Sequence, residues 1–293
     1  MSIRPANQFV RRSFLKSTAL AAAGIVAGGG GRTTVQAAET AQTAGPPAKK
    51  LALELGIASY TFRSFPLDQC LAMTARVGLK HVCLKDFHLP MKATPEQLEQ
   101  AAAKAKKLGL DLYGGGVIYM GNEAAVNQAF EYAKGAGMRT IVGVPVPAVL
   151  PLVNDKVKQY DIRVAIHNHG PGDKTYPTPE SICEKIKDLD KRIGLCIDVG
   201  HTIRVGADPI RDVERFADRL LDVHMKDVTA ATPAGREIEV GRGVIDVPAL
   251  LRMLVKVRYS GIVSFEHESD AKDPLPGLAE SVGYVRGVLA AMG

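Results

Sequence analysis

The chain has 293 residues, 46% of them hydrophobic, and a formal net charge of +6 at pH 7. This length suits one large domain or two small ones, and the apolar content is enough for a buried core. Residues 1–37 carry five basic side chains and no acidic one, whereas the rest of the chain carries 32 basic against 31 acidic side chains. Because this larger part has no basic run, its composition argues against nucleic-acid binding.

The N-terminal segment has the features of an export signal. Residues 11–16 read RRSFLK, and an apolar stretch leads to a small-residue V-Q-A site at residues 35–37. Paired arginines before a mildly hydrophobic segment are typical of twin-arginine signals. We therefore expect a signal peptide over residues 1–37, a flexible lead-in over residues 38–52, and periplasmic localisation through the twin-arginine translocation machinery. The four cysteines have no CxxC spacing, so we expect buried free thiols.

From residue 53 onward, apolar runs of strand length alternate with segments of helical pattern. The strand-like runs lie at residues 55–60, 81–85, 110–117, 140–144, 163–168, 194–198, 220–226 and 261–266. The helix-like segments lie at residues 67–77, 95–108, 123–136, 146–160, 179–189, 209–217, 248–257 and 276–291. Several of these helices open with a capping residue and proline, as at Thr94-Pro95 and Thr178-Pro179.

Eight such β–α units predict the α/β class and a single (β/α)8 TIM barrel over residues 53–293. An open doubly wound sheet is the alternative, but no glycine-rich nucleotide-binding motif follows any of the runs. Glycines 114–116 lie at the end of the third run. Their missing side chains admit a ligand or a neighbouring backbone, or they mark a loose strand end.

Polar side chains follow the apolar cores of four runs, at the end where each strand stops. The runs are VAIHNHG (His167, His169), LCIDVGH (Asp198, His201), LDVHMKD (His224, Lys226) and VSFEHES (Glu266). In a closed parallel barrel the carboxyl ends of all strands open on one rim, so these residues should meet there. Imidazoles and carboxylates that converge in this way predict one divalent metal ion, and mixed nitrogen and oxygen ligands fit Mn²⁺, Zn²⁺, Co²⁺ or Fe²⁺.

Further rim residues are candidates for substrate contacts. Lys85, in LKDFH, is the first charged residue of an apolar strand and is interpreted as a proton donor or carbonyl clamp, or else as a surface lysine. His88 follows it as a substrate-binding candidate. Arg236 lies in the charged, glycine-rich loop GREIEVGRGVID, which either folds over the cup or stays solvated. Asp198 and His201 lie close enough for one to bind metal and the other substrate.

With these residues placed, the chain resembles the xylose-isomerase-like barrel superfamily, in particular its sugar phosphate isomerase/epimerase type. The resemblance covers about residues 53–293 and rests on the Asp-x-x-His motif, the strand-seven His with Lys-Asp, the G-x-G-x-[IV]-D loop and the last-strand Glu. It implies metal ligation by Asp198, His224 and Glu266, a substrate contact by His201, and a substrate grip by Arg236.

The chain departs from that pattern at the first ligand. Where such relatives commonly have Glu-x-His, this chain has His167-Asn168-His169, so His167 is the fourth predicted ligand. An imidazole whose lone pair is on a metal cannot easily act as a second base, and the loss of one negative charge makes the metal a stronger electrophile. This departure argues against two-base epimerisation and leaves single-base proton abstraction.

The resulting prediction is a metal-dependent sugar isomerase or epimerase that forms an enediolate by proton abstraction beside a carbonyl. Glu266 is the preferred base, and Lys85, His169 or Lys226 is the acid. An exported lyase that cleaves 3-keto-glycosides by β-elimination is the runner-up, which the export signal favours. A non-catalytic periplasmic sugar binder and an apurinic endonuclease on the same barrel are further alternatives. The expected partner is a small sugar or keto-sugar, and a homo-oligomer is left open.

Overall fold

The computed structural model of the chain describes residues 53–292. The signal peptide expected over residues 1–37 and the lead-in expected over residues 38–52 lie outside the described residues, so both stay predictions. Between residues 53 and 292, no helix has both the length and the apolar character that a membrane span requires.

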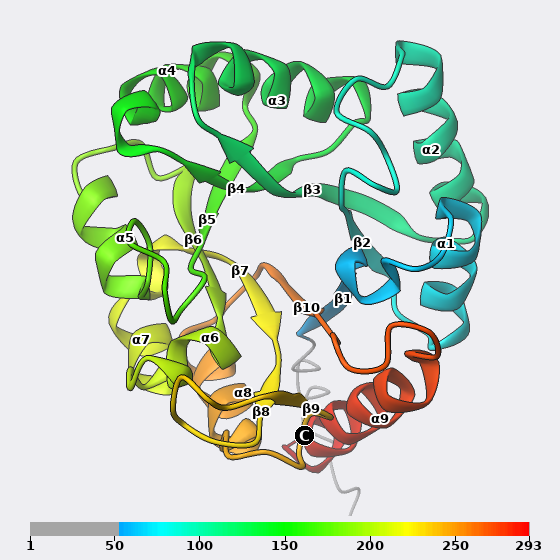
Figure 1. Cartoon of the computed structure of the whole chain (residues 1–293), viewed down its shortest axis with the longest axis vertical. Coiled ribbons are helices and arrows are strands. Elements are labelled where there is room, and N and C mark those ends of the chain that lie inside the picture. The colour runs from blue at the N-terminus through cyan, green and yellow to red at the C-terminus, as the bar shows by residue number, and fades with distance from the viewer. Residues whose placement is uncertain (1–52, 293) are drawn as a thin grey trace, which may run out of the picture. The chain divides into compact units, whose positions relative to one another are not determined.

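Eight parallel strands close into a barrel, which Figure 1 shows as a ring. The barrel strands are β1 (Glu54–Ala58), β2 (His81–Leu84), β3 (Asp111–Met120), β4 (Thr140–Pro145), β5 (Arg163–His167), β6 (Ile193–Asp198), β7 (Leu220–Met225) and β10 (Ile262–Phe265). Consecutive barrel strands are neighbours around the ring, and β1 closes it by pairing with β10. The predicted single (β/α)8 barrel is therefore confirmed, and its strands coincide with the eight apolar runs to within a few residues.

Helices surround the ring and cover the outer face of the strands (Figure 1). They are α1 (Leu67–Arg76), α2 (Pro95–Lys107), α3 (Glu123–Gly135), α4 (Leu150–Tyr160), α5 (Pro179–Ile186), α6 (Val199–Arg204), α7 (Pro209–Arg215), α8 (Val247–Lys256) and α9 (Leu275–Met292). Short 3-10 turns lie at Ser59–Phe62, Pro147–Val149 and Ala217–Arg219. The predicted start signals operate as expected, because Thr94 and Thr178 each close a capping box at the first turn of α2 and α5.

Two features of the fold were not expected from the sequence. The helix α6 is a short addition directly after β6, where the sequence suggested only a turn. The strands β8 (Asp227–Val228) and β9 (Glu237–Ile238) form a separate antiparallel pair after β7. Both are too short to leave a periodic pattern that separates them from a loop.

The apolar core has two layers. A large cluster lies between the outer face of the strands and the helices. A smaller cluster fills the interior of the barrel with Cys83, Tyr113, Val142, Ala165 and Cys196, each from a different strand. Because side chains fill the interior of the barrel, ligands can bind only at its ends.

The glycines of β3 allow the strand to approach its neighbour closely. A Cβ atom at Gly116 would lie 2.3 Å from the backbone oxygen of Val142, and one at Gly114 would lie 2.9 Å from that of Thr140. Of the interpretations left open by the sequence, the close approach of a neighbouring backbone therefore applies.

The four cysteines are all free. Cys70, Cys83 and Cys196 are buried and Cys183 is half-buried, so the expected buried thiols are confirmed for three of them. Burial raises the pKa of the Cys70 thiol to about 12, which keeps it protonated and unreactive.

Candidate metal centre

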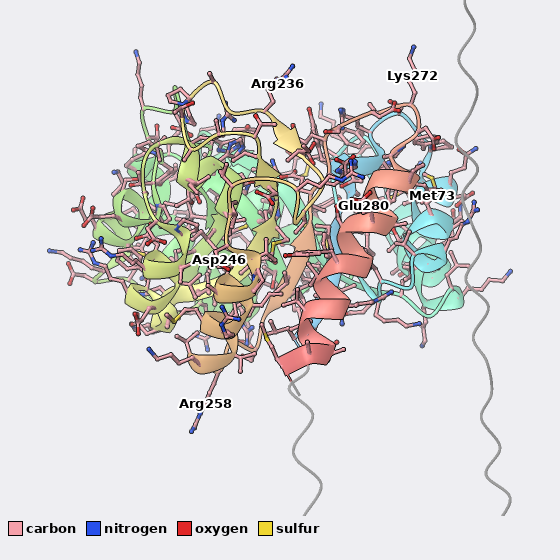
Figure 2. All side chains as sticks on the ribbon, turned by 90° about the horizontal axis from the view of Figure 1, so that it is seen from below. Met73, Arg236, Asp246, Arg258, Lys272 and Glu280 are labelled. Carbon is pink, nitrogen blue, oxygen red and sulfur yellow. The ribbon has the colours of Figure 1, made fainter. Side chains whose placement is uncertain are left out.

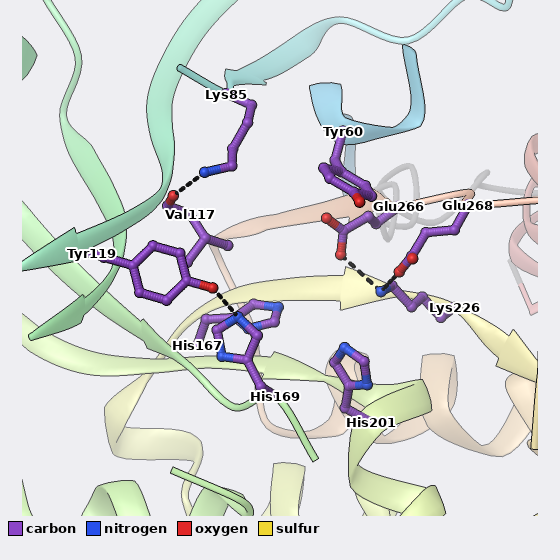
Figure 3. A pocket seen from close by; sticks show the side chains of 10 residues that line it. All are labelled: Tyr60, Lys85, Val117, Tyr119, His167, His169, His201, Lys226, Glu266 and Glu268. Carbon is purple, nitrogen blue, oxygen red and sulfur yellow. Dashed lines mark hydrogen bonds and ion pairs between the residues drawn. The ribbon is translucent and has the colours of Figure 1, made fainter. Parts of the chain in front are cut away.

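A polar cavity, here called the cup, opens at the carboxyl ends of the barrel strands (Figure 3). Its volume is about 210 Å³, below the roughly 300–1,000 Å³ of pockets for drug-sized ligands, which suits a molecule of monosaccharide size. The lining side chains are Tyr60, Lys85, Val117, Tyr119, His167, His169, His201, Lys226, Glu266 and Glu268.

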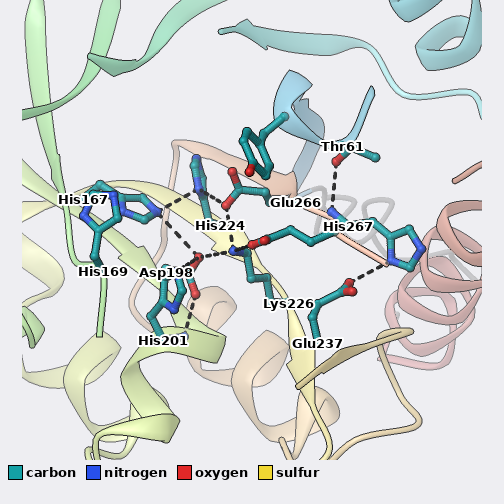
Figure 4. Close-up of polar contacts among 12 residues, drawn as sticks. Thr61, His167, His169, Asp198, His201, His224, Lys226, Glu237, Glu266 and His267 are labelled. Atoms are coloured by element: carbon teal, nitrogen blue, oxygen red, sulfur yellow. Dashed lines mark hydrogen bonds and ion pairs between the residues drawn. The ribbon is translucent and has the colours of Figure 1, made fainter. Parts of the chain in front are cut away.

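Two imidazoles and two carboxylates cluster at the buried base of the cup (Figure 4). The residues are His167, Asp198, His224 and Glu266, and their four ligand atoms all lie within 4.8 Å of one another. Nδ1 of His224 lies 3.1 Å from both Nε2 of His167 and Oε2 of Glu266. Nε2 of His167 lies 3.6 Å from Oδ2 of Asp198. The structure thus brings the four predicted ligands together, and their binding of a metal stays a prediction.

The local structure around Asp198 leaves one of its oxygens for this cluster. Asp198 ends β6 and caps α6, where its Oδ1 accepts a hydrogen bond of 2.7 Å from the backbone N–H of His201. Asn168 turns away from the cup, accepts from the backbone N–H of Asp198 at 3.0 Å, and donates to the hydroxyl of Thr202 at 3.1 Å. The second oxygen, Oδ2, is buried and faces the cluster, where Nζ of Lys226 lies 3.1 Å away and Nε2 of His167 lies 3.6 Å away.

The two imidazoles of the cluster have opposite protonation preferences. Burial lowers the pKa of His167 to about 3, so this ring is neutral near pH 7 and keeps a lone pair for a ligand. Burial also opposes protonation of His224, but the charge and hydrogen bond of Glu266 outweigh it and raise the pKa of this ring. A cation that binds Nδ1 of His224 must therefore displace a proton that Glu266 stabilises.

Lys226 supplies a buried positive charge beside the cluster. Its Nζ lies 3.1 Å from Oδ2 of Asp198 and 3.0 Å from Oε2 of Glu266, and it also pairs with Glu268. Burial opposes ionisation of both Asp198 and Glu266. The charges of His201 and Lys226 hold the pKa of Asp198 well below its usual range, and those of Lys226 and His224 do the same for Glu266. Both carboxylates are thus ionised and ready to bind a cation.

The donor set fits a divalent cation. Two carboxylate oxygens and two ring nitrogens surround one small region, and Oδ2 of Asp198 shares the ammonium group of Lys226 with Oε2 of Glu266. Two buried carboxylates that share one ammonium group beside the neutral ring of His167 carry excess negative charge, which is characteristic of a cation site. The mixed nitrogen and oxygen ligands suit a borderline metal and do not identify which one.

His169 and Tyr119 form the wall of the cup opposite Glu266 and Lys226 (Figure 3). The hydroxyl of Tyr119 lies 3.2 Å from Nε2 of His169, and their rings stack with centroids 5.9 Å apart. Burial, followed by the charge of His201, lowers the pKa of His169. This predicted site residue therefore lines the cup as a mostly neutral imidazole.

The predicted residues Lys85 and His201 also line the cup. Nζ of Lys85 donates to the backbone oxygen of Val117 at 2.6 Å and lies 3.3 Å from a carboxylate oxygen of Asp86. Nε2 of His201 lies 3.9 Å from Oδ2 of Asp198. Both side chains therefore border the cavity, and their contacts with a substrate stay predictions.

His88, predicted to bind substrate, does not line the cup. Its Nδ1 lies 2.9 Å from the hydroxyl of Ser59, and its Nε2 lies 3.2 Å from the backbone oxygen of Phe62 and 3.0 Å from that of Phe65. Both ring nitrogens therefore hold the 3-10 turn after β1, and the contact of His88 with a substrate stays a prediction.

Arg236, the other predicted substrate contact, is exposed and projects from the rim of the barrel (Figure 2). It lines a separate hollow with Glu237 and Ser269, which adjoins the cup only through the shared residue Glu268. Arg236 therefore does not line the cup in this structure, and its contact with a substrate stays a prediction. In the same loop, Arg242 binds Glu280 of α9 at 2.5 Å.

The Lys-Asp and G-x-G-x-[IV]-D motifs have a structural explanation in Asp227. Its buried carboxylate accepts hydrogen bonds from the backbone N–H groups of Val228, Gly241, Gly243 and Ile245, at 2.9 to 3.1 Å. One side chain thus fixes both ends of the loop between β8 and α8.

Several residues of the site were not among the predicted ones. Tyr60, Tyr119 and Glu268 line the cup, and Asp222 lies buried within the barrel. Glu268 shares a strand face with Glu266 in the sequence pattern, and this spacing was a usable signal. Tyr60 and Tyr119 follow apolar runs without any polar partner nearby, so the sequence offered no signal for them.

Residues 146–288 match the model of the xylose isomerase-like TIM barrel family. This part of the chain contains β5 to β10 and all four clustered residues. The resemblance inferred from the sequence motifs is therefore confirmed over residues 146–288.

The chain is also similar to individual curated proteins in sequence and to solved structures in fold. Inosose dehydratase of Lacticaseibacillus casei is 26% identical over 137 residues, which are 41% of this chain and 45% of that protein. The chain spans less than half the length of the curated relatives it matches. The structure of 3-keto-D-glucoside 4-epimerase YcjR from E. coli has a TM-score of 0.67 at 16% identity, covering 80% of this chain and 100% of that one. The structure of IOLI protein with a bound zinc atom has a TM-score of 0.69 at 17% identity, covering 82% and 99%.

Proposed function

We propose that this protein is a divalent-metal-dependent isomerase or epimerase that acts on a small sugar or keto-sugar. The reaction begins with removal of the proton beside a carbonyl group and proceeds through an enediolate. The observation that carries the proposal is the cluster of His167, Asp198, His224 and Glu266 within 4.8 Å, at the base of a cup of monosaccharide size. The fold shared with YcjR, a 3-keto-D-glucoside 4-epimerase, supports it.

Glu266 is the proposed base. Its contacts with His224 and Lys226 run through Oε2, so Oε1 is the oxygen that can take a proton from a ligand in the cup. The carboxylate is ionised at neutral pH because Lys226 and His224 hold its pKa well below the usual range. An ionised, positioned carboxylate within a dry pocket is suited to general-base catalysis.

The remaining cluster residues hold and orient the cation. When bound, a divalent cation would supply an electrophile that stabilises negative charge developing on a carbonyl oxygen. His167 contributes a neutral imidazole and Asp198 an ionised carboxylate, and Asn168 fixes the backbone of Asp198. Lys226 balances the negative charge of the carboxylates and keeps them apart from bulk water.

A proton donor is required on the other side of the substrate. His169 lines the wall opposite Glu266, and Tyr119 contacts its Nε2 at 3.2 Å (Figure 3). Lys226 is a poor acid, because neighbouring carboxylates raise its pKa well above its usual range against the effect of burial. The lowered pKa of His169 leaves this ring mostly neutral, so the acid role falls to the protonated minority of His169. Lys85 can polarise a carbonyl oxygen from the adjacent wall.

The second candidate function is that of an exported lyase, which would cleave 3-keto-glycosides by β-elimination with the same base. The same enediolate expels a leaving group from the β-carbon if an acid protonates that group. The inosose dehydratase of L. casei, whose name describes loss of water, favours this outcome. Periplasmic localisation through the twin-arginine pathway is part of this proposal.

One experiment separates these outcomes. The purified protein, loaded with Mn²⁺ or Zn²⁺, is incubated in D₂O with 3-keto-glycosides and free ketoses, and NMR follows the products. Deuterium in an intact sugar identifies an isomerase or epimerase, whereas release of an aglycone or water identifies a lyase. The absence of both with every substrate would contradict the proposal.

Glu266→Gln distinguishes catalysis from simple binding. This variant keeps the shape of the side chain and removes its basicity, so turnover should fall by about 10²- to 10⁴-fold while sugar still binds. Wild-type turnover in this variant would exclude Glu266 as the base. Wild-type protein that binds sugar without any turnover would identify a periplasmic sugar binder.

A further inference from the structure

A carboxylate that the proposed reaction does not use lies below the metal cluster. Asp222 precedes His224 by two positions on β7, so both side chains point into the barrel. Asp222 is fully buried, and neither of its carboxylate oxygens has a hydrogen-bond partner among the described residues. Such a group destabilises a protein unless something pairs with it, so its presence in the interior calls for a functional explanation.

His224 has a complementary unpaired atom. Its Nδ1 faces His167 and Glu266, so this nitrogen must offer its lone pair when a cation binds. The ring proton then resides on Nε2, because a neutral imidazole carries one proton. Nε2 is buried and has no partner among residues 53–292. It therefore needs an acceptor in the interior of the barrel.

Few acceptors are available for that proton. Among the buried polar atoms without a partner in the described residues, the oxygens are Oδ2 of Asp198 and both oxygens of Asp222. Oδ2 of Asp198 belongs to the ligand cluster. The hydroxyls of Tyr113 and Ser264 pair with each other at 2.7 Å and keep lone pairs, but they are neutral, and an ionised carboxylate is the stronger acceptor.

We propose that Asp222 is a positioning residue for the metal ligand His224. Its carboxylate accepts the Nε2–H of His224 through one bridging water, since no nitrogen–oxygen pair of the two side chains lies within 4.0 Å. A water with polar partners on both sides is stable in such a site. The interaction fixes the tautomer and the orientation of the ring, and outer carboxylates of this kind commonly tune the affinity of a histidine ligand. The inference rests on the metal site of the proposed function.

The test compares metal affinity in Asp222→Leu and Asp222→Asn with that of the wild-type protein. Affinity for Zn²⁺ is measured by competition with a chromophoric chelator. We expect Asp222→Leu to bind about 10- to 100-fold more weakly, and Asp222→Asn to recover most of this loss because its amide oxygen is still an acceptor. The matched control is Cys83→Ala, a change in the same interior cluster that should leave affinity unchanged.

A second measurement separates positioning from a merely structural role. Because Asp222 is an unpaired buried carboxylate, Asp222→Leu should melt at the same or a higher temperature than the wild type in the absence of metal. The ¹⁵N-resolved NMR signal of His224 should show the Nε2–H tautomer in the wild type and a mixture of tautomers in Asp222→Leu.

The outcomes are distinguishable from a failure of the proposed function. If the wild type binds no metal, the proposed function fails. If the wild type binds Zn²⁺ and both Asp222 variants bind within twofold of it, the metal site stands and the role of Asp222 is wrong. A fall in metal-free melting temperature together with unchanged affinity would assign Asp222 to structure alone.

Discussion

The ammonium group of Lys226 lies 3.0 Å from Oε2 of Glu266, so the proposed base is held by a buried cation. The same ammonium pairs with Asp198 and Glu268. One positive charge is therefore shared among three carboxylates, two of which are proposed metal ligands. A divalent cation would neutralise the remaining charge, which links occupancy of the site to the stability of the barrel.

Lys226→Met should destabilise the metal-free protein far more than the metal-loaded protein. Removal of one partner from a buried ion pair leaves uncompensated charge and typically costs about 3–5 kcal/mol. A bound divalent cation replaces much of that lost positive charge, so the difference from wild type should shrink when metal is saturating. Urea unfolding with and without Zn²⁺ measures both free energies of unfolding.

The matched control for this prediction is Lys256→Met. Lys256 pairs with Glu214 at 2.6 Å on the exposed surface, where an ion pair contributes only about 0–1 kcal/mol. The decrease in the free energy of unfolding of Lys256→Met should be small and should not depend on metal. If Lys226→Met lost the same free energy with and without Zn²⁺, the charge-sharing explanation would be wrong.

The stability of the metal-free protein should fall as the pH drops from about 6.5 to 3. Burial lowers the pKa of His167 to about 3, whereas an unfolded histidine titrates near 6.5. Across this window the unfolded state therefore binds one more proton than the native state at this position. The free energy of unfolding then decreases by up to about 1.4 kcal/mol per pH unit as pH falls.

His224 does not cancel this slope. Its pKa is raised in the folded state by Glu266, against the effect of burial, so its contribution is fully present below pH 6.5 and is lost only as pH rises through the folded value. The lowered pKa values of His88, His169 and His201 act in the same direction as that of His167, and the pKa of Asp222, which burial raises to about 7, acts in the opposite direction. Urea denaturation at several pH values measures the total slope, and His167→Gln should make it less steep by the contribution of this one ring. An equally steep slope in that variant would contradict the assignment to His167.

The barrel and its ligand cluster were predictable because both follow from strand periodicity. Apolar runs fixed the eight strands, and parallel closure requires their polar ends to meet, which brings Asp198, His224 and Glu266 together. His167 and His169 both reach the cup because they are two positions apart in an extended segment.

The predicted residues that do not line the cup lie in loops, where no periodicity specifies the direction of a side chain. His88 follows its strand by a few residues, and the chain turns so that both ring nitrogens bind the segment after β1. Arg236 was assigned through a family motif, but the antiparallel pairing of β8 with β9 directs it outward. The spacing of Asp222 from His224 was a usable signal for a residue inside the barrel, because positions two apart on a strand share a face.

Asp227→Ala should loosen the loop between β8 and α8. The buried carboxylate accepts four backbone hydrogen bonds, and each bond to a charged group contributes about 1.5–3 kcal/mol, although such contributions are not additive. Hydrogen exchange at the amides of Gly241 and Gly243 should accelerate by several orders of magnitude.

The control for this loop is Asp246→Ala, which removes only the cap of α8, where Asp246 accepts from the backbone N–H of Ala249 at 2.9 Å. A lost cap costs about 1 kcal/mol, and the exchange of Gly241 and Gly243 should hardly change. Unchanged exchange in Asp227→Ala would show that other contacts fix the loop.

Replacement of the paired arginines, Arg11→Lys with Arg12→Lys, should abolish export in a bacterium with twin-arginine machinery. The pair precedes an apolar stretch and a small-residue site at residues 35–37, the pattern on which the signal assignment rests. Cell fractionation should find wild-type protein in the periplasm, beginning at Ala38, and the double variant in the cytoplasm. Arg4→Lys, which changes a basic residue outside the pair, should leave export intact. Export of the double variant, or export of the wild type in a strain without that machinery, would show that the arginine pair is not a twin-arginine export signal.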